Sequence, residues 1–199
     1  MKKFIVIDGL DGSGKDTQSQ FVFEMYKNNS NSETFDEKIV LRSHPETDNY
    51  YGLECHKALL KEGKLNKIIA TIFYALDIFH SLILYYPKSD ILIFSRYLLA
   101  PAYFPTIMVK PAYILFSFIL PTSNYMFYLD LSPEIAIERI TARITDKNQK
   151  LQSFENIESL KKTRKKINLI SSDWIKIDGS KDKNEIKEEI ENILLNNKQ

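Results

Sequence analysis

The residues best suited to chemistry lie in one short segment, Gly9-Leu-Asp-Gly-Ser-Gly-Lys15-Asp16-Thr17. Bare glycine backbone can present several N–H donors to phosphate oxygens in a small concave space, and the start of a helix adds partial positive charge. The spacing G-x-x-x-x-G-K is that of the Walker A loop, whose lysine reaches the β- and γ-phosphates of a nucleotide. We therefore expect ATP phosphates to bind here, at Gly9, Gly12, Ser13, Gly14 and Lys15. The alternative, a glycine turn with an incidental lysine, fits the strand–loop–helix context less well.

The residue after the lysine departs from this motif. It is normally a Ser or Thr that holds Mg²⁺, whereas here it is Asp16, followed by Thr17. Either Thr17 takes the metal, or Asp16 ligates it directly or through water. A third interpretation is that Asp16 is only the acidic residue favoured in a first helical turn. We predict Mg²⁺ at Asp16 or Thr17 and leave the choice open.

Short apolar runs and longer segments of helical period must position this loop. Runs of strand length occupy residues 4–7, 38–42, 91–94, 125–129 and 174–177. The strongest helical pattern is 65–84, Ser132-Pro133 begins another helix, and the last helix aligns apolar residues between 186 and 194. Strands that alternate with helices favour a parallel sheet covered on both faces. We predict one α/β domain over residues 1–199, with five strands, about seven helices and flexible loops near 28–32 and 146–153.

Composition narrows the class of protein. The chain has 199 residues, 44% hydrophobic and 27% charged, which fits one globular domain and argues against disorder or a coiled coil. A net charge of +1 gives no basic surface for nucleic acid. Cys55 is the single cysteine and the apolar run 4–7 is too short for a secretory signal, so we expect a cytoplasmic protein. Four prolines cut the apolar region 91–129 into pieces too short to span a membrane, which we interpret as core and subunit interface.

Beyond the loop, the chain resembles the thymidylate kinase family of P-loop nucleoside monophosphate kinases. The segment FIVIDGLDGSGKDTQSQ is similar to the first strand and phosphate loop of that family, YLDLSPEIAIER at 128–139 to its fourth strand and next helix, and IDGS at 177–180 to its adenine loop. The resemblance covers nearly the whole chain. It implies a P-loop kinase fold, a three-layer αβα sandwich with a five-stranded parallel sheet and a short lid at about 141–154. It also implies a homodimer that uses Mg²⁺ and transfers the γ-phosphoryl group of ATP to a nucleoside monophosphate. The acceptor that the resemblance favours is dTMP.

On the ATP side, the resemblance adds Arg139, Gly179 and Ser180 to the phosphate loop as binding residues. Kinases with a glycine at the position of Gly12 tend to bring a catalytic arginine from the lid. The closest lid position here is Ser153, so Arg143 and Lys150 are the substitutes we consider. A solvated, charged helix end is the alternative for both.

On the acceptor side, the family motifs have changed. The F-P-x-R segment reads His44-Pro45-Glu46-Thr47, and Asp-Arg-Tyr reads Ser95-Arg96-Tyr97. The phenylalanine that stacks on thymine corresponds to Phe73, and Asp77 replaces the arginine that bonds the base. A carboxylate only accepts hydrogen bonds, so Asp77 at the base would favour an N–H group. A core aromatic and a solvated or capping carboxylate are the alternatives for Phe73 and Asp77.

Arg96 has the clearest functional interpretation on the acceptor side. It follows a buried strand at the carboxyl end of the sheet, where ligands bind in this fold class, and a desolvated guanidinium needs an anion. That anion is either the acceptor phosphate or a structural carboxylate. We predict that the acceptor is bound by Asp11, Phe73, Asp77, Arg96, Tyr97 and Tyr103. We predict that the catalytic residues are Lys15, Asp11, Arg96 and Arg143, so that Asp11 and Arg96 belong to both groups.

These changes leave three hypotheses for function. The first is a dTMP kinase. The second keeps phosphoryl transfer but changes the acceptor to another nucleotide or a nucleoside. The third is a nucleotide-binding protein with little catalysis, suggested by Thr47, Asp77 and Ser95.

Overall fold

The sheet has five parallel strands in the order β2-β3-β1-β4-β5. The structure is a computed structural model, which describes residues 3–29, 37–61, 63–147 and 156–196. The strands are β1 (Lys3–Gly9), β2 (Ile39–Ser43), β3 (Ile91–Ser95), β4 (Tyr125–Asp130) and β5 (Ile175–Asp178). All five predicted strands are confirmed, with ends shifted by at most two residues. The central strand β1 runs directly into the glycine loop, which places that loop at the carboxyl edge of the sheet.

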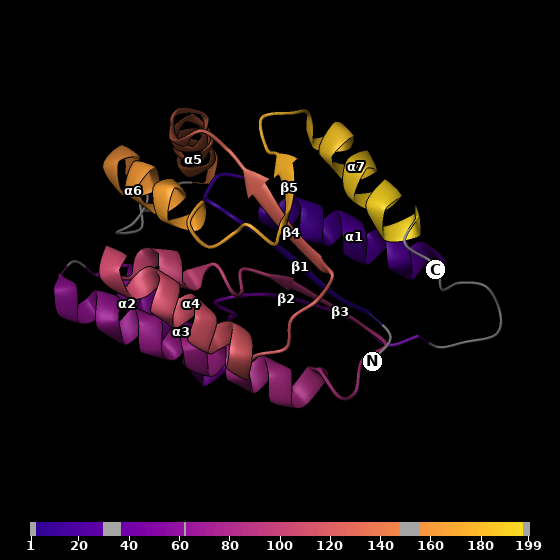
Figure 1. The fold of residues 1–199 in the computed structure, drawn as a ribbon, viewed down its shortest axis with the longest axis horizontal. Coiled ribbons are helices and arrows are strands. Elements are labelled where there is room, and N and C mark those ends of the chain that lie inside the picture. The colour runs from indigo at the N-terminus through magenta and orange to yellow at the C-terminus, as the bar shows by residue number, and fades with distance from the viewer. Residues whose placement is uncertain (1–2, 30–36, 62, 148–155, 197–199) are drawn as a thin grey trace.

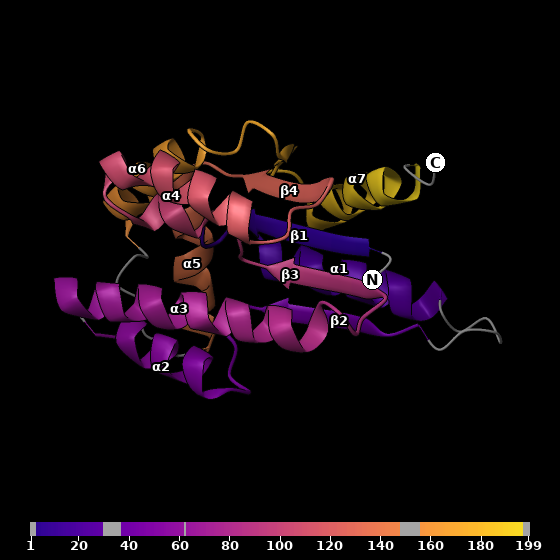
Figure 2. The ribbon, with the colours of Figure 1, turned by 60° about the horizontal axis from the view of Figure 1, so that its bottom comes forward.

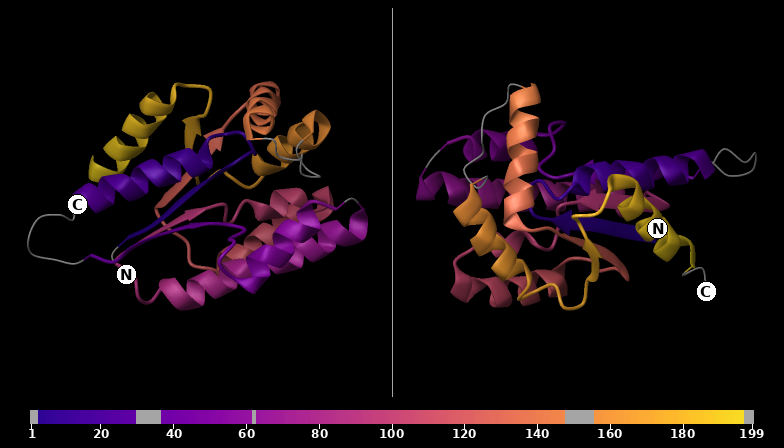
Figure 3. Two further views of the ribbon diagram at one scale, coloured as in Figure 1. Left: turned by 180° about the vertical axis from the view of Figure 1, so that it is seen from behind. Right: turned by 90° about the horizontal axis from the view of Figure 1, so that it is seen from above.

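Helices cover both faces of this sheet, as Figures 1 and 3 show. The helical elements are α1 (Lys15–Asn29), α2 (Tyr50–Leu59), α3 (Lys64–Tyr85), the short 3₁₀ helix η1 (Ala100–Tyr103), α4 (Thr106–Ile119), α5 (Pro133–Lys147), α6 (Ile157–Ile167) and α7 (Lys183–Asn196). Helices α1 and α7 lie side by side on one face, while α3 and α4 lie on the other with α2 outside α3 (Figure 2). The predicted α/β class and the seven helices are confirmed within the described residues.

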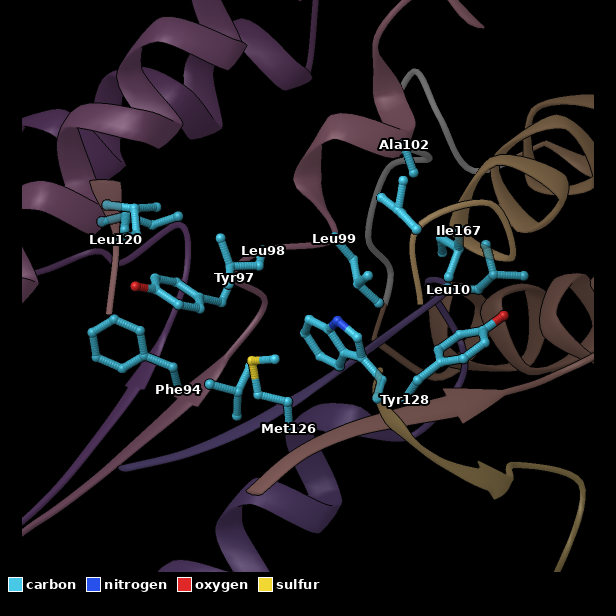
Figure 4. Packing of buried hydrophobic residues seen from close by; sticks show 14 of the residues in the cluster. Leu10, Phe94, Tyr97, Leu98, Leu99, Ala102, Leu120, Met126, Tyr128 and Ile167 are labelled. Carbon is cyan, nitrogen blue, oxygen red and sulfur yellow. The ribbon is translucent and has the colours of Figure 1, made fainter. Parts of the chain in front are cut away.

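The hydrophobic core is divided by the sheet into two parts. Successive side chains of a strand point to opposite faces, so Phe4 and Val6 of β1 pack with α3, α4, α5 and α6, whereas Ile5 and Ile7 pack with α1 and α7. Figure 4 shows the first of these clusters, in which the Tyr97 ring lies close to Phe94. The two apolar layers hold β1 rigidly, and with it the loop that follows.

Two sequence predictions about loops need correction. Residues 28–29 and 146–147, predicted as flexible loop, are the last residues of α1 and α5. Acidic or amide residues do not end a helix when its apolar face still packs on the core. Of the predicted lid, residues 141–147 continue α5, and the rest, with Lys150 and Ser153, lies outside the described residues.

Helix α3 is the longest helix and carries an unusual apolar surface. Within the described residues, its segment Leu65–Tyr85 is the one helix that is long and apolar enough to cross a membrane, with a mean hydropathy of 1.8, and 28% of it is buried. Ala70, Ile78 and Leu82 form its buried side. The helical pattern at 65–84 predicted this helix, but the most apolar region was expected at 91–129 and not here.

Candidate active site

The glycine loop has the geometry of a phosphate cradle. Gly12 and Gly14 have φ angles of +82° and +90°, a region that residues with a Cβ rarely adopt. A Cβ on Gly12 would lie 2.6 Å from the backbone oxygen of Ala136, whereas a Cβ on Gly14 would project into open space. The hydroxyl of Ser13 is buried and has no hydrogen-bond partner in the described part of the chain. A buried hydroxyl without a partner, in a loop of this geometry, is a group that a phosphate oxygen would satisfy.

Lys15 is the buried cation of this loop. Its side chain is 3% exposed, and Nζ donates to the backbone oxygen of Leu10 at 2.9 Å and to Asp11 Oδ1 at 3.0 Å. Burial alone would raise the pKa of Asp11, but the charges of Lys15 and Arg96 outweigh it and lower that pKa. Asp11 is therefore an anion that balances Lys15.

Arg96 joins the end of β3 to the start of α1. Its φ of +64° is rare for a residue with a side chain, and such strain is concentrated at functional sites. Its guanidinium donates to Asp16 Oδ1 at 2.6 Å and lies 3.7 Å from Asp11 Oδ1. Ser95 Oγ also donates to Asp16 Oδ1, at 2.7 Å. Burial would raise the pKa of Asp16, but Arg96, Lys15 and Ser95 together lower it.

Asp8 fixes the position of this cluster. It is buried at the end of β1 and accepts hydrogen bonds from the backbone N–H groups of Gly9, Tyr97 and Leu99. Burial is the largest influence on its pKa, which is raised. Because one carboxyl group binds both the glycine loop and the segment after β3, Lys15 and Arg96 are held in a fixed relation.

A cavity of about 400 Å³ opens beside these charges. The volume lies within the range of roughly 300–1,000 Å³ that is usual for small-molecule sites. Its charged lining comes from the end of β1, the glycine loop, the start of α1 and the residue after β3: Asp8, Asp11, Lys15, Asp16 and Arg96. Its apolar lining comes from helices, with Cys55 and Leu59 of α2, Ala70, Tyr74 and Ile78 of α3, and Phe116 of α4. The cavity therefore combines an anion-binding region with an apolar slot suited to a flat ring.

A sequence profile of the thymidylate kinase family matches residues 7–190 of this chain. The chain belongs to the thymidylate kinase family. It is 28% identical to a probable thymidylate kinase 1 of Saccharolobus solfataricus over 99% of each chain. It is 30% identical to a thymidylate kinase of Leptospira interrogans over 98% of this chain and 94% of the relative.

The fold agrees with the family assignment. The structure of thymidylate kinase from Candida albicans superposes with a TM-score of 0.72 at 18% identity, over 99% of this chain and 92% of that one. At that identity the match shows the shared P-loop kinase fold. The resemblance noted from the motifs is thus confirmed, and the protein is a kinase, a phosphotransferase that uses ATP.

The structure brings four of the predicted acceptor residues together at the cavity: Asp11, Arg96, Tyr97 and Tyr103. The Tyr103 hydroxyl lies 3.4 Å from Asp11 Oδ2. Tyr97 has mainly a packing role, since its hydroxyl donates to the Pro121 carbonyl and its ring contacts Phe4 and Phe94.

Phe73 and Asp77 are the two predicted acceptor residues that do not line the cavity. Phe73 packs edge-on against Tyr50, with ring centroids 5.9 Å apart. The next residue, Tyr74, lines the cavity instead. Its spacing of three and four from Thr71 and Ile78, which also line the cavity, could have identified this face of α3.

On the ATP side, Arg139 of α5 donates to the backbone oxygen of Gly179 at 3.0 Å. The Gly179 N–H donates to the Asp130 carbonyl at 2.8 Å, and Ser180 Oγ donates to Asp178. These contacts place the predicted adenine loop against α5. Arg143 follows Arg139 by one turn of α5 and does not line the cavity.

The residues around Asp16 fit a magnesium ion. Asp16 is ionised, and within the described chain its hydrogen bonds engage Oδ1 and leave Oδ2 open. Thr17 is exposed beside it in the first turn of α1. Mg²⁺ prefers carboxylate, hydroxyl and water oxygens and usually takes few protein ligands.

Proposed function

We propose that this protein transfers the γ-phosphoryl group of ATP to the phosphate of dTMP, which gives ADP and dTDP. The observation that carries the proposal is the shared cavity: Lys15 of the phosphate loop and Arg96, directly after β3, border the same apolar slot. An enzyme for this reaction must hold a donor phosphate and an acceptor phosphate side by side, next to a place for a base. Phosphoryl transfer depends mainly on positioning and charge neutralisation, which such an arrangement supplies.

Lys15 and Arg96 supply the positive charge. Both are paired with carboxylates, Lys15 with Asp11 and Arg96 with Asp16. When nucleotides bind, Lys15 turns from Asp11 to the β- and γ-phosphates of ATP, and Arg96 binds the acceptor phosphate. Asp11 and Tyr103 then lie beside the acceptor. On the donor side, Arg139, Gly179 and Ser180 surround the adenine, and Arg143 is the basic residue that approaches the transferred group.

The magnesium site uses an exchanged pair of side chains. P-loop enzymes hold Mg²⁺ with the hydroxyl that follows the lysine and with a carboxylate at the end of a neighbouring strand. Here the carboxylate, Asp16, follows the lysine, and the hydroxyl, Ser95, ends β3. The 2.7 Å hydrogen bond between them supports the view that the same two groups are present in swapped positions. Asp16 and Ser95 would hold Mg²⁺ beside the phosphate loop, where the ion would supply positive charge to offset that of the phosphates.

The protein acts as a cytoplasmic homodimer in this proposal. Helix α3 exposes one continuous apolar stripe whose side chains are 40–72% exposed: Leu65, Ile68, Ile72, Leu76, Phe79 and Ile83. Monomeric proteins rarely leave such a patch in water. A second copy of the chain would cover it.

The proposal is tested with purified protein, ATP, Mg²⁺ and a panel of dTMP, dCMP, dGMP and thymidine. We expect dTDP to form with a kcat/KM at least tenfold above that of any other acceptor. Preferential phosphorylation of thymidine or of another monophosphate would contradict the choice of dTMP. ATP binding without acceptor-stimulated ADP release would contradict catalysis altogether.

A further inference from the structure

His44 and Asp77 form a buried pair beside the cavity. His44 follows β2, Asp77 lies on α3, and both side chains are 0% exposed. His44 Nδ1 lies 2.8 Å from Asp77 Oδ2. The backbone N–H of Glu46 donates to the same oxygen at 2.8 Å, and the side-chain amide of Asn49 donates to Oδ1 at 2.7 Å. Asp77 therefore accepts three hydrogen bonds from one turn and has no contact with the cavity.

This geometry decides which ring nitrogen of His44 carries hydrogen. Burial would raise the pKa of Asp77, but the hydrogen bonds from His44, Glu46 and Asn49 outweigh it and lower that pKa. An ionised carboxylate can only accept, so the hydrogen lies on Nδ1. In the tautomer with hydrogen on Nδ1, the lone pair of the ring lies at Nε2.

Nε2 is the unsatisfied end of this pair. It is buried and has no hydrogen-bond partner among the residues that the structure describes. His44 lines the cavity, where its ring lies between Phe94 and Tyr74 at centroid distances of 4.8 and 6.4 Å. An unpaired buried acceptor costs stability unless a ligand satisfies it.

Other polar groups of the apolar lining already donate within the protein. Cys55 Sγ donates to the Ala70 carbonyl and Thr71 Oγ1 to the Lys67 carbonyl. His56 Nε2 lies 2.8 Å from the Pro45 carbonyl and donates to it. Among the cavity-lining residues that the structure describes, a base in this slot therefore meets His44 Nε2 as a buried acceptor that lacks a donor.

We propose that His44 Nε2 accepts a hydrogen bond from the ring N3–H of the acceptor's thymine, and that Asp77 is the positioning residue that orients it. The inference rests on the proposed function and adds the group that selects the base. Thymine has a hydrogen at N3, whereas cytosine has a lone pair there. The same contact that binds thymine therefore repels cytosine.

The first test measures the dissociation constants of dTMP, dCMP and ATP by calorimetry for the wild type and for His44→Phe. We expect His44→Phe to weaken dTMP about tenfold and to reduce the dTMP/dCMP preference by a similar factor, with ATP unchanged. Because His44→Phe removes one of the three hydrogen-bond donors to the buried Asp77, the double variant His44→Phe/Asp77→Asn is measured beside it. The matched control is His80→Phe, since His80 also has an unpartnered ring nitrogen but does not line the cavity.

A second test needs no cavity variant. The chain has three histidines, so their ring nitrogens can be resolved by ¹⁵N NMR. Without ligand, His44 should show hydrogen on Nδ1 alone, and added dTMP should shift its Nε2 signal while that of His80 stays in place. Asp77→Asn should give a mixture of tautomers and a reduced preference for dTMP, which a merely structural role of Asp77 would not produce.

Three results would overturn the inference. One is an unchanged dTMP/dCMP preference in a folded His44→Phe variant that still phosphorylates dTMP, which leaves the proposed function intact. Another is a wild-type Nε2 signal that dTMP does not move. The last is a wild type that neither binds nor phosphorylates dTMP, which would remove the proposed function as well.

Discussion

At the scale of residues, the site is organised by a few charged side chains. The Lys15 side chain is 3% exposed and that of Arg96 is 25% exposed, and each cation is paired with a carboxylate of the same small cluster. A buried charge is tolerated only when it is paired. The carboxylates Asp11 and Asp16 therefore keep both cations in place until phosphates take over the pairing.

Lys15→Ala tests the phosphate loop. Removing this charge from the transition state should lower kcat by roughly 10² or more, because charge stabilisation in a preorganised site is the largest catalytic contribution of this kind. Steady-state kinetics with ATP and dTMP measure the effect. Lys57→Ala, at an exposed lysine of α2, is the control and should keep full activity. Equal activity of both variants would refute the role of the loop.

Asp16 and Ser95 are tested by exchanging them. Asp16→Ser and Ser95→Asp should each weaken Mn²⁺ binding to the protein–ATP complex, which electron paramagnetic resonance measures directly. The double variant Asp16→Ser/Ser95→Asp should regain most of it, because both oxygen groups are again present. A double variant no better than the single ones would reject the exchanged pair.

The site could be predicted from the sequence where its chemistry is local. Gly9 to Thr17 are consecutive, so the motif alone indicated the phosphate loop. Phe73 and Tyr74 differ by about 100° around a helix, and only packing shows that Tyr74 faces the cavity. Asp77 was expected at the base, but its partner His44 is 33 residues away, and no spacing rule connects them.

At the scale of elements, the turn between β2 and α2 depends on close packing. Asn49 caps α2 by accepting a hydrogen bond from the Gly52 N–H. A Cβ on Gly52 would lie 1.9 Å from the backbone oxygen of Glu46. The absence of a side chain at Gly52 thus lets α2 approach the turn that carries His44.

Gly52→Ala should therefore move this turn. We expect a loss of about 1–3 kcal/mol in the free energy of unfolding, as for other overpacked sites, together with weaker dTMP binding and unchanged ATP binding. Urea unfolding and calorimetry measure the two effects. Glu54→Ala, on the same helix, is the control. If the free energy of unfolding of Gly52→Ala equalled that of the wild type, Gly52 would not lie in close contact with the Glu46 backbone in solution.

The hydrogen bonds between Asp77 of α3 and the turn that carries His44 should stabilise the protein in a pH-dependent way. The pKa of Asp77 is lowered in the folded protein, so its ionised form contributes stability above its unfolded pKa of 3.8, and that contribution is lost as pH falls through the folded pKa. Asp77→Asn should destabilise the protein by about 1–3 kcal/mol at pH 7 and by less at pH 3. Unfolding in urea at both values measures this. Asp173→Asn should show no such trend, and an equal effect of Asp77→Asn at both pH values would contradict the assignment.

The helices and strands were easier to predict from the sequence than the surfaces that each of their faces meets. The central strands β1, β3 and β4 contain short, continuous apolar runs because both faces of the sheet are covered, and such runs are distinct in sequence. The period of 65–84 correctly predicted α3, but much of its apolar stripe faces outward. Hydrophobic period indicates which side chains share a face, and not whether that face meets the core or another molecule.

At the scale of the whole molecule, the exposed stripe of α3 predicts self-association. Light scattering should give twice the mass of the chain, and Ile72→Glu, in the middle of the stripe, should shift the protein to a monomer. Leu195→Glu places the same charge at an exposed leucine of α7 and should leave the dimer intact. A monomeric wild type would reject the dimer.

Phosphoryl transfer from ATP to dTMP, within one cavity that holds both phosphates, is the central claim. The most direct measurement is chromatographic quantification of the products after incubation with ATP, Mg²⁺ and dTMP. We predict equal amounts of ADP and dTDP from the wild type, and roughly 10²-fold less of both, or lower still, from Lys15→Ala in the same time. ADP without dTDP, or no product from the folded wild-type protein, would contradict the claim.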